Sequence, residues 1–192
     1  MTGQPAQAAR DEEPSSARLA AYAAPALPLA IIALPFYVLV PAFYAGEFGL
    51  AIAAVGQVLF GVRLLDAISD PVVGVLADRF RPRLGRRRLW VAAAVPGVVV
   101  GAWQVFSPPA GAGLFHLALW GCVLSVAWTT IQIPYAARGA ELSRSYAGRN
   151  RVTAWRETFT VVGTLLALAT PAILPALGIP GDRAVLTTFA VA

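Results

Sequence analysis

Long apolar segments separated by short polar ones make up most of this chain. A helix that crosses the hydrocarbon layer of a bilayer needs about 20 mostly apolar residues, and several segments reach that length. Their apolar residues are continuous and do not alternate with polar ones, which favours helices over the strands of a barrel. We predict five complete membrane helices and the beginning of a sixth, at about residues 20–45, 50–77, 89–106, 114–137, 155–177 and 184–192.

The first 18 residues, MTGQPAQAARDEEPSSAR, differ from the rest because they are small, polar and of mixed charge. We expect residues 1–18 to form a disordered cytoplasmic tail and residues 19–192 to form one transmembrane unit. The composition agrees, since 58% of the chain is hydrophobic and only 13% is charged. The predicted fold class is therefore an all-α polytopic membrane protein.

The net charge of +5 comes from arginine alone, because the chain contains no lysine. Nucleic-acid binding is one class that a basic chain raises. Here, however, the arginines concentrate in two segments between apolar runs, residues 78–88 and 138–151. Arginine-rich segments in such places are typical of cytoplasmic loops. We therefore expect a cytoplasmic N-terminus, with the lipid bilayer and not nucleic acid as a partner.

The second predicted helix carries three charges that a membrane helix normally lacks. At 100° per residue, Arg63, Asp66, Asp70 and Gly74 fall on one narrow stripe. Charges at membrane depth are costly and normally face an interior or an aqueous cavity. Two carboxylates four residues apart repel each other unless a cation lies between them, and Ser69 adds a further hard oxygen ligand. Arg63 is suited to neutralise such a site when it is empty.

A second interpretation of this stripe stays open at this point. If the helix begins at Leu50, Asp70 lies near the cytoplasmic edge of the bilayer, where it would pair with loop arginines as part of a solvated helix end.

The segment that follows, GVLADRFRPRLGRRR, begins at Gly74 and includes Asp78, Gly85, Arg86 and Arg87. A solvated run of charge is the ordinary explanation. The order of small, apolar and acidic residues before a basic run nevertheless resembles the loop-2–3 signature of the major facilitator superfamily, here lengthened between Asp78 and Gly85.

Two motifs together make the resemblance specific. RLLDAISDPVVG is similar to the second-helix motif of the glycoside–pentoside–hexuronide:cation symporters, the melibiose permease-like family. Residues 128–159 resemble the fourth helix and following loop of the same family. The similarity covers about residues 20–190. It implies the N-terminal six-helix half of a major facilitator fold, with a truncated sixth helix and a missing C-terminal six-helix half as its partner. It also implies the bacterial cytoplasmic membrane as location.

The resemblance assigns roles to named residues of the cation site. It implies that Asp66 and Asp70 bind the coupling Na⁺, Li⁺ or H⁺, with Ser69 and Thr129 as added oxygen ligands. No other cofactor is expected. The arginine-rich segments and Glu141 would hold a cytoplasmic gate, although Glu141 is equally suited to be a solvated partner of Arg138 or Arg144.

The resemblance also implies a substrate site, and here the chain departs from the family pattern. Arg156 matches an arginine associated with the sugar site. Ala30 and Gln132, however, stand where the melibiose-type pattern has acids. Gln132 offers a donor and an acceptor to a ligand, or an interhelical hydrogen bond instead. An apolar first helix favours a more lipophilic substrate, and animal relatives of this fold carry lysophospholipids with Na⁺.

We therefore expect a secondary active transporter and not an enzyme, with cation-coupled symport of a sugar or another small organic solute by alternating access. A lysolipid or other lipophilic solute is the first alternative. Two remote alternatives are a metal-dependent phosphotransferase, whose D-x-x-D-G-x-x-A-R order is not found here, and a non-transporting truncated product.

Overall fold

The computed structural model describes residues 14–79, 88–143, 145–176, 178 and 181–191. Within these residues every regular element is a helix, as the sequence predicts. The helices are α2 (Ser16–Ala23), α3 (Ala26–Phe48), α4 (Ile52–Arg79), α5 (Arg88–Phe106), α6 (Leu114–Glu141), α7 (Tyr146–Ala176) and α8 (Asp182–Val191).

Several of these helices are long and apolar enough to cross a membrane. Among the described residues, four such spans occur, at Ser16–Phe48, Ile52–Ala77, Leu114–Glu141 and Tyr146–Leu174. The apolar part of α5 is shorter, at Trp90–Phe106. The four long spans correspond to the first, second, fourth and fifth predicted helices, and the shorter segment to the third.

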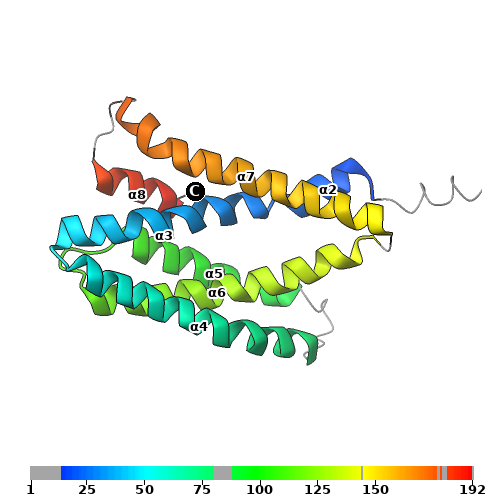
Figure 1. Ribbon diagram of the computed structural model, residues 1–192, viewed down its shortest axis with the longest axis horizontal. Helices are drawn as coiled ribbons and strands as arrows, with labels where there is room; N and C mark the ends of the chain where they lie inside the picture. Colours follow the sequence, from blue (N-terminus) through cyan, green and yellow to red (C-terminus); the bar gives the residue numbers. More distant parts are fainter. Residues whose placement is uncertain (1–13, 80–87, 144, 177, 179–180, 192) are drawn as a thin grey trace, which may run out of the picture.

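The helices lie in two layers (Figure 1). One layer holds α4, α5 and α6, in which α6 packs against both neighbours, and the other holds α2, α3, α7 and α8. The layers meet through α3, which contacts α4 and α5, and through α8, which contacts α5. At this junction Phe106 of α5 and Phe189 of α8 are buried, with ring centroids 6.3 Å apart.

Small residues set the distance between neighbouring helices. A Cβ atom at Gly101 of α5 would lie 3.0 Å from the Cα atom of Leu124 on α6. A Cβ atom at Gly163 of α7 would lie 2.5 Å from the carbonyl oxygen of Leu27 on α3. Helices in a bilayer associate largely by close packing of this kind, which glycine permits. These two contacts therefore bring the backbones of each layer together.

The first predicted helix, at 20–45, is divided in the structure. α2 ends at Ala23 and α3 begins at Ala26, so the division falls at Pro25. Proline has no N–H to donate, which breaks the helical hydrogen-bond ladder at this point. The described structure also begins its first helix at Ser16, inside the predicted tail, and the Ser15 hydroxyl accepts a hydrogen bond from the Arg18 amide as an N-cap. Residues 1–13 of the predicted tail lie outside the described residues.

The prediction that residues 138–151 form a loop is wrong, because helices occupy most of this segment. α6 continues to Glu141 and α7 begins at Tyr146, so Arg138 lies on α6 and Arg149 on α7. A helix can continue past the apolar layer into water, since arginine and glutamate favour helix as much as leucine does. The Ser145 hydroxyl accepts a hydrogen bond from the Gly148 amide, 2.9 Å away, and so caps the start of α7.

Candidate cation and solute site

Two carboxylates of α4 face two hydroxyls of α6. The Ser125 hydroxyl donates to Oδ1 of Asp66, and the Thr129 hydroxyl donates to Oδ1 of Asp70 over 2.8 Å. Both pairs are separated by 59 positions in sequence, and the two helices run in the same direction, so one register aligns both contacts (Figure 1). Ser125 and Thr129 are 8% and 4% exposed. The two helices therefore hold four side-chain oxygen groups along one seam.

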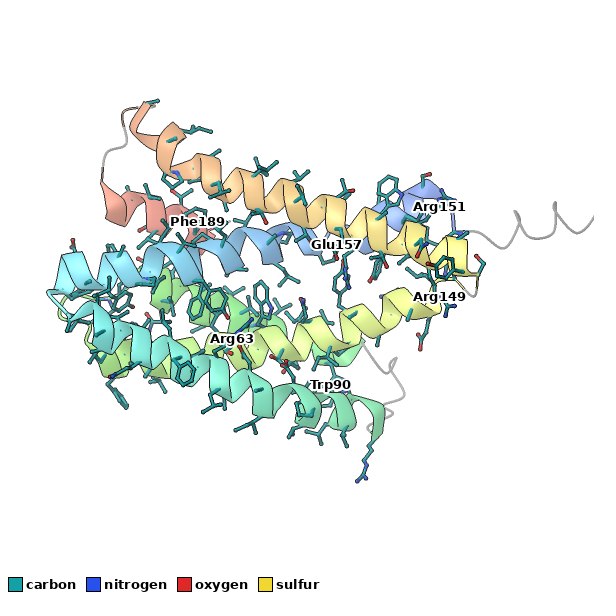
Figure 2. The ribbon with its side chains drawn as sticks, in the orientation of Figure 1. Arg63, Trp90, Arg149, Arg151, Glu157 and Phe189 are labelled. Carbon is teal, nitrogen blue, oxygen red and sulfur yellow. The ribbon has the colours of Figure 1, made fainter. Side chains whose placement is uncertain are left out.

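Arg63 connects this seam to α3. Its guanidinium donates to the Tyr37 hydroxyl over 3.0 Å and pairs with Oδ2 of Asp66 at 3.3 Å. The guanidinium carbon also lies 5.3 Å from the centroid of the Tyr37 ring, within cation–π range. Figure 2 shows Arg63 on the side of α4 that faces α3. One carboxylate oxygen of Asp66 thus accepts from Ser125, and the other pairs with Arg63.

Burial differs along this group of residues. The Arg63 side chain is 67% exposed, whereas the Asp66 side chain is 14% exposed. Asp70 is exposed, although its hydroxyl partner Thr129 is buried. Asp66 therefore occupies the most enclosed position of the three charged groups.

Ser69 adopts a different arrangement from the one expected. Its hydroxyl donates to the main-chain carbonyl of Asp66, 3.4 Å away, within α4 itself. Ser125 instead supplies the hydroxyl at the Asp66 carboxylate, and it was not among the predicted ligands. Its spacing of four residues before Thr129, which matches the spacing of the two acids, is the signal in the sequence that points to it.

The seam between α4 and α6 offers a cation the side-chain oxygens of two carboxylates and two hydroxyls. Among the described residues, no three His, Cys, Asp or Glu side chains come together as a metal-binding group. A set of two carboxylates and two hydroxyls fits a hard cation such as Na⁺, because hard cations prefer oxygen ligands.

A cavity of about 270 Å³ adjoins the seam and is lined by α3, α4 and α6. α3 contributes mainly apolar side chains, among them Ile32 and Phe36. Polar groups come from Tyr37 on α3, from Arg63 and Asp66 on α4, and from Ser125, Trp128 and Gln132 on α6. Apolar walls with a few convergent polar groups are typical of small-molecule sites.

The structure brings only one of the two predicted substrate residues to this cavity. Gln132 is exposed and lines the cavity, whereas Arg156 does not appear in its lining. Arg156 lies ten residues inside α7 and not at its start, and it pairs with Glu157 at 2.8 Å. Figure 2 marks Glu157 on α7, in the opposite layer from the Asp66 seam.

An aromatic contact joins α2 to α6. The rings of Tyr22 and Tyr135 stack with centroids 4.9 Å apart, and the Tyr22 hydroxyl donates to the Tyr135 carbonyl over 3.4 Å. Tyr22 also lies against Gly139, where an added Cβ atom would collide with its hydroxyl. This contact places the short helix α2 over the end of α6.

The residues predicted for a gate are placed as follows. Gly74 lies where α4 approaches α6, since an added Cβ atom would be 4.0 Å from Ile133. Arg138 and Glu141 are exposed on the last turns of α6. Asp78 falls in the last turn of α4. The predicted residues Gly85, Arg86 and Arg87 lie outside the described residues.

Comparison with known proteins identifies the family. The family model described as MFS/sugar transport protein matches residues 21–192. The uncharacterized symporter sll1374 of Synechocystis sp. is 33% identical over 160 residues, which is 78% of this chain and 28% of the relative. The inner membrane symporter YicJ of Escherichia coli is 33% identical over 128 residues, which is 65% of this chain and 28% of the relative.

Animal proteins are also similar to this chain. The sodium-dependent lysophosphatidylcholine symporter 1 of Xenopus tropicalis is 31% identical over 135 residues, which is 68% of this chain and 24% of the relative. The chain thus spans about a quarter of the length of these relatives. They are named as transporters and not as enzymes, and the predicted all-α membrane fold agrees with the family match. The chain belongs to the MFS/sugar transport protein family, and its predicted place among the glycoside–pentoside–hexuronide:cation symporters of the major facilitator superfamily is confirmed.

Proposed function

We propose that this chain is the N-terminal six-helix half of a secondary transporter that couples a cation to the symport of a small organic solute. The observation that carries the proposal is the pair of contacts between α4 and α6, from Ser125 to Asp66 and from Thr129 to Asp70. Charged carboxylates at membrane depth are expensive and mark ion pathways. The relatives named as symporters favour the same activity.

In this proposal the coupling cation, Na⁺, Li⁺ or H⁺, binds at Asp66 and Asp70, and Thr129 adds an oxygen ligand. The adjoining cavity takes the solute, with Gln132 as its polar contact. Because Asp66 both lines the cavity and belongs to the cation seam, binding of one ligand changes the surroundings of the other. A differential effect of this kind is the coupling free energy that symport requires.

Transport needs a second six-helix half, against which this half would rock around a central site. We propose that the arginine-rich segment 78–88, the end of α6 and the start of α7 form the cytoplasmic gate, with Arg138 and Glu141 among its members. Arg149 and Arg151 lie at the same end of the bundle (Figure 2). The positive-inside rule assigns that end, and the N-terminus, to the cytoplasm. The bacterial inner membrane is the proposed location, in line with the name of the E. coli relative.

A lysolipid is the second candidate solute, and two observations favour it. The animal relatives are sodium-dependent lysophosphatidylcholine symporters by name. The α3 wall of the cavity consists of Ile32, Ala33, Phe36 and Tyr37. It carries no acid, and its one hydroxyl, that of Tyr37, accepts from Arg63. A sugar needs several polar partners for its hydroxyls, whereas an acyl chain needs apolar walls.

The test uses the complete natural protein that contains this chain. Its melting temperature is measured against NaCl, LiCl and pH, because a ligand that binds the folded state stabilises it by RT ln(1 + [L]/Kd), about 2.7 kcal/mol at 100 times Kd. We expect Na⁺ or Li⁺ to raise the melting temperature of the wild type. Asp70→Asn should abolish the effect, and Glu47→Gln, an acid-to-amide change at the end of α3, should retain it.

The solute is then identified by titration. Trp128 lines the cavity, so its fluorescence should change when a solute binds there. Melibiose-type glycosides and lysophosphatidylcholine are compared with and without Na⁺. A wild type whose stability responds to neither ion at any pH, and whose Asp70→Asn variant behaves identically, would show that these acids bind no coupling cation.

A further inference from the structure

Ser125 stands apart from most hydroxyl side chains in the described helices. Six threonines on α6, α7 and α8 donate to the carbonyl four residues earlier in their own helix, and so do not reach another element. Thr130, beside Thr129, is an example, with 2.7 Å to the Val126 carbonyl. This back-bonding is the common state of serine and threonine in membrane helices. Ser125 instead donates across the helix interface to a carboxylate.

Ser125 also occupies two environments at once. It is 92% buried, since its exposed fraction is 8%, and it lines the solute cavity together with Asp66. Thr129, by contrast, contacts Asp70 and is not in the cavity lining. Ser125 is therefore the hydroxyl that touches both the proposed cation seam and the proposed solute cavity.

We propose that Ser125 determines the ion specificity of the cation site, by supplying a fourth oxygen ligand that Na⁺ and Li⁺ use and a proton does not. The inference rests on the proposed cation coupling and names a residue of that same site.

The chemistry of a hydroxyl makes this role possible without movement of the backbone. A serine oxygen has one proton to donate and two lone pairs to offer. When no cation is bound, the proton points to the Asp66 carboxylate, as in the structure. When a cation lies between the helices, rotation about the Cβ–Oγ bond turns a lone pair to the ion, and the ligand set becomes two carboxylates and two hydroxyls. A proton needs only a carboxylate, so it gains nothing from Ser125.

The experiment compares four variants of the complete protein. Ser125→Ala removes the oxygen with little change in volume, and Ser125→Cys replaces it with a soft sulfur of similar size, which is a poor ligand for Na⁺. Thr130→Val is the matched control, because it removes a hydroxyl of the same helix that is bonded to its own backbone. Asp70→Asn reports on the proposed function itself. The half-saturating concentrations of Na⁺ and Li⁺ are read from ion-dependent melting temperatures and from Trp128 fluorescence, at fixed pH and across a pH series.

We expect both Ser125 variants to raise the half-saturating Na⁺ concentration about tenfold, which corresponds to about 1.4 kcal/mol. The ratio of the Na⁺ value to the Li⁺ value should also change, because the two ions differ in size. Proton binding should not weaken, because the Ser125 hydroxyl donates to the ionised form of Asp66 and does not favour its protonation. Thr130→Val should match the wild type throughout.

Three results would overturn the inference. If both Ser125 variants bind Na⁺ like the wild type while Asp70→Asn does not, cation coupling stands and Ser125 is not a ligand. If Na⁺, Li⁺ and proton responses weaken by the same factor, Ser125 only supports the local packing. If the wild type is insensitive to Na⁺ and Li⁺, the inference about Ser125 fails, and if its response to pH also equals that of Asp70→Asn, the proposed cation coupling fails with it.

Discussion

The contact between α3 and α7 yields a sharp prediction about stability. At Gly163 an added Cβ atom would lie 2.5 Å from the Leu27 carbonyl oxygen and 3.0 Å from the Ala30 Cβ atom. Ordinary contact begins at 3.4 Å, so Gly163→Ala requires the two helices to separate by about 3.4 − 2.5 = 0.9 Å at this point. The oxygen belongs to the backbone and cannot rotate away as a side chain would.

The cost of this separation is that of overpacking an interface, about 1–3 kcal/mol. Alanine also favours helix over glycine by about 1 kcal/mol, which would conceal part of the effect in a single variant. Gly56 and Gly61 of α4 provide controls, because an added Cβ atom at either meets nothing within 4 Å. They lie five positions, and therefore about 140°, apart on the helix, so one partner surface does not cover both.

The three glycine-to-alanine variants are compared by thermal unfolding in the same detergent, followed by size-exclusion chromatography of the remaining folded protein. The gain in helix propensity is common to all three, so the difference isolates the packing cost. At about 2–4 °C per kcal/mol for a unit of this size, Gly163→Ala should melt several degrees below both controls. A Gly163→Ala protein that melts at or above both of them would refute the close approach of α3 and α7.

Three further predictions concern polar and aromatic side chains. Tyr135→Phe should be neutral or should stabilise the protein by about 1 kcal/mol, because the buried Tyr135 hydroxyl has no hydrogen-bond partner among the described residues. Tyr44→Phe should instead destabilise the protein by about 1 kcal/mol, because it removes a 3.3 Å hydrogen bond to a carbonyl. Thermal unfolding of the two variants checks the two signs. Gly139→Ala should destabilise the wild type and cost less in a Tyr22→Ala background, with a coupling energy of about 0.5–3 kcal/mol in a double-mutant cycle; additive effects would contradict the contact. Gln132→Asp should strengthen glycoside binding through charge-assisted hydrogen bonds, as measured by tryptophan fluorescence, and unchanged binding would remove Gln132 from the solute site.

Much of the fold could be predicted because a bilayer leaves few choices. Apolar segments of sufficient length must be helical, and the glycine- and proline-containing polar segments between them separate one helix from the next. The pairing of Asp66 with Asp70 on one face was also predictable, since it depends only on the helical repeat. Both predictions use local sequence and a property of the solvent.

Other features escape a prediction that rests on apolar segments, because such a prediction does not weigh local contacts between polar residues or choose among several prolines. α7 begins at Tyr146, nine residues before the predicted start, because the polar segment that precedes the apolar run is capped by Ser145 and continues as helix in water. Arg156 is drawn into an ion pair with Glu157 on its own helix and does not line the cavity. The break at Pro25 was one of four possible proline positions in the first apolar run, and the sequence does not distinguish among them.

The register between α4 and α6 explains how a short sequence motif becomes a site. Two acids four residues apart on one helix form a stripe with a rise of about 6 Å, and two hydroxyls with the same spacing on a parallel helix meet them only when the helices align at one offset. Here that offset is 59 positions for both pairs, so a slide of a single residue would lose both contacts together. Asp66 is the position where this register meets α3, because its second oxygen pairs with Arg63, which in turn reaches Tyr37. A change in the occupancy of the seam therefore acts directly on the side chains that line the cavity, and it needs no longer path through the bundle to do so.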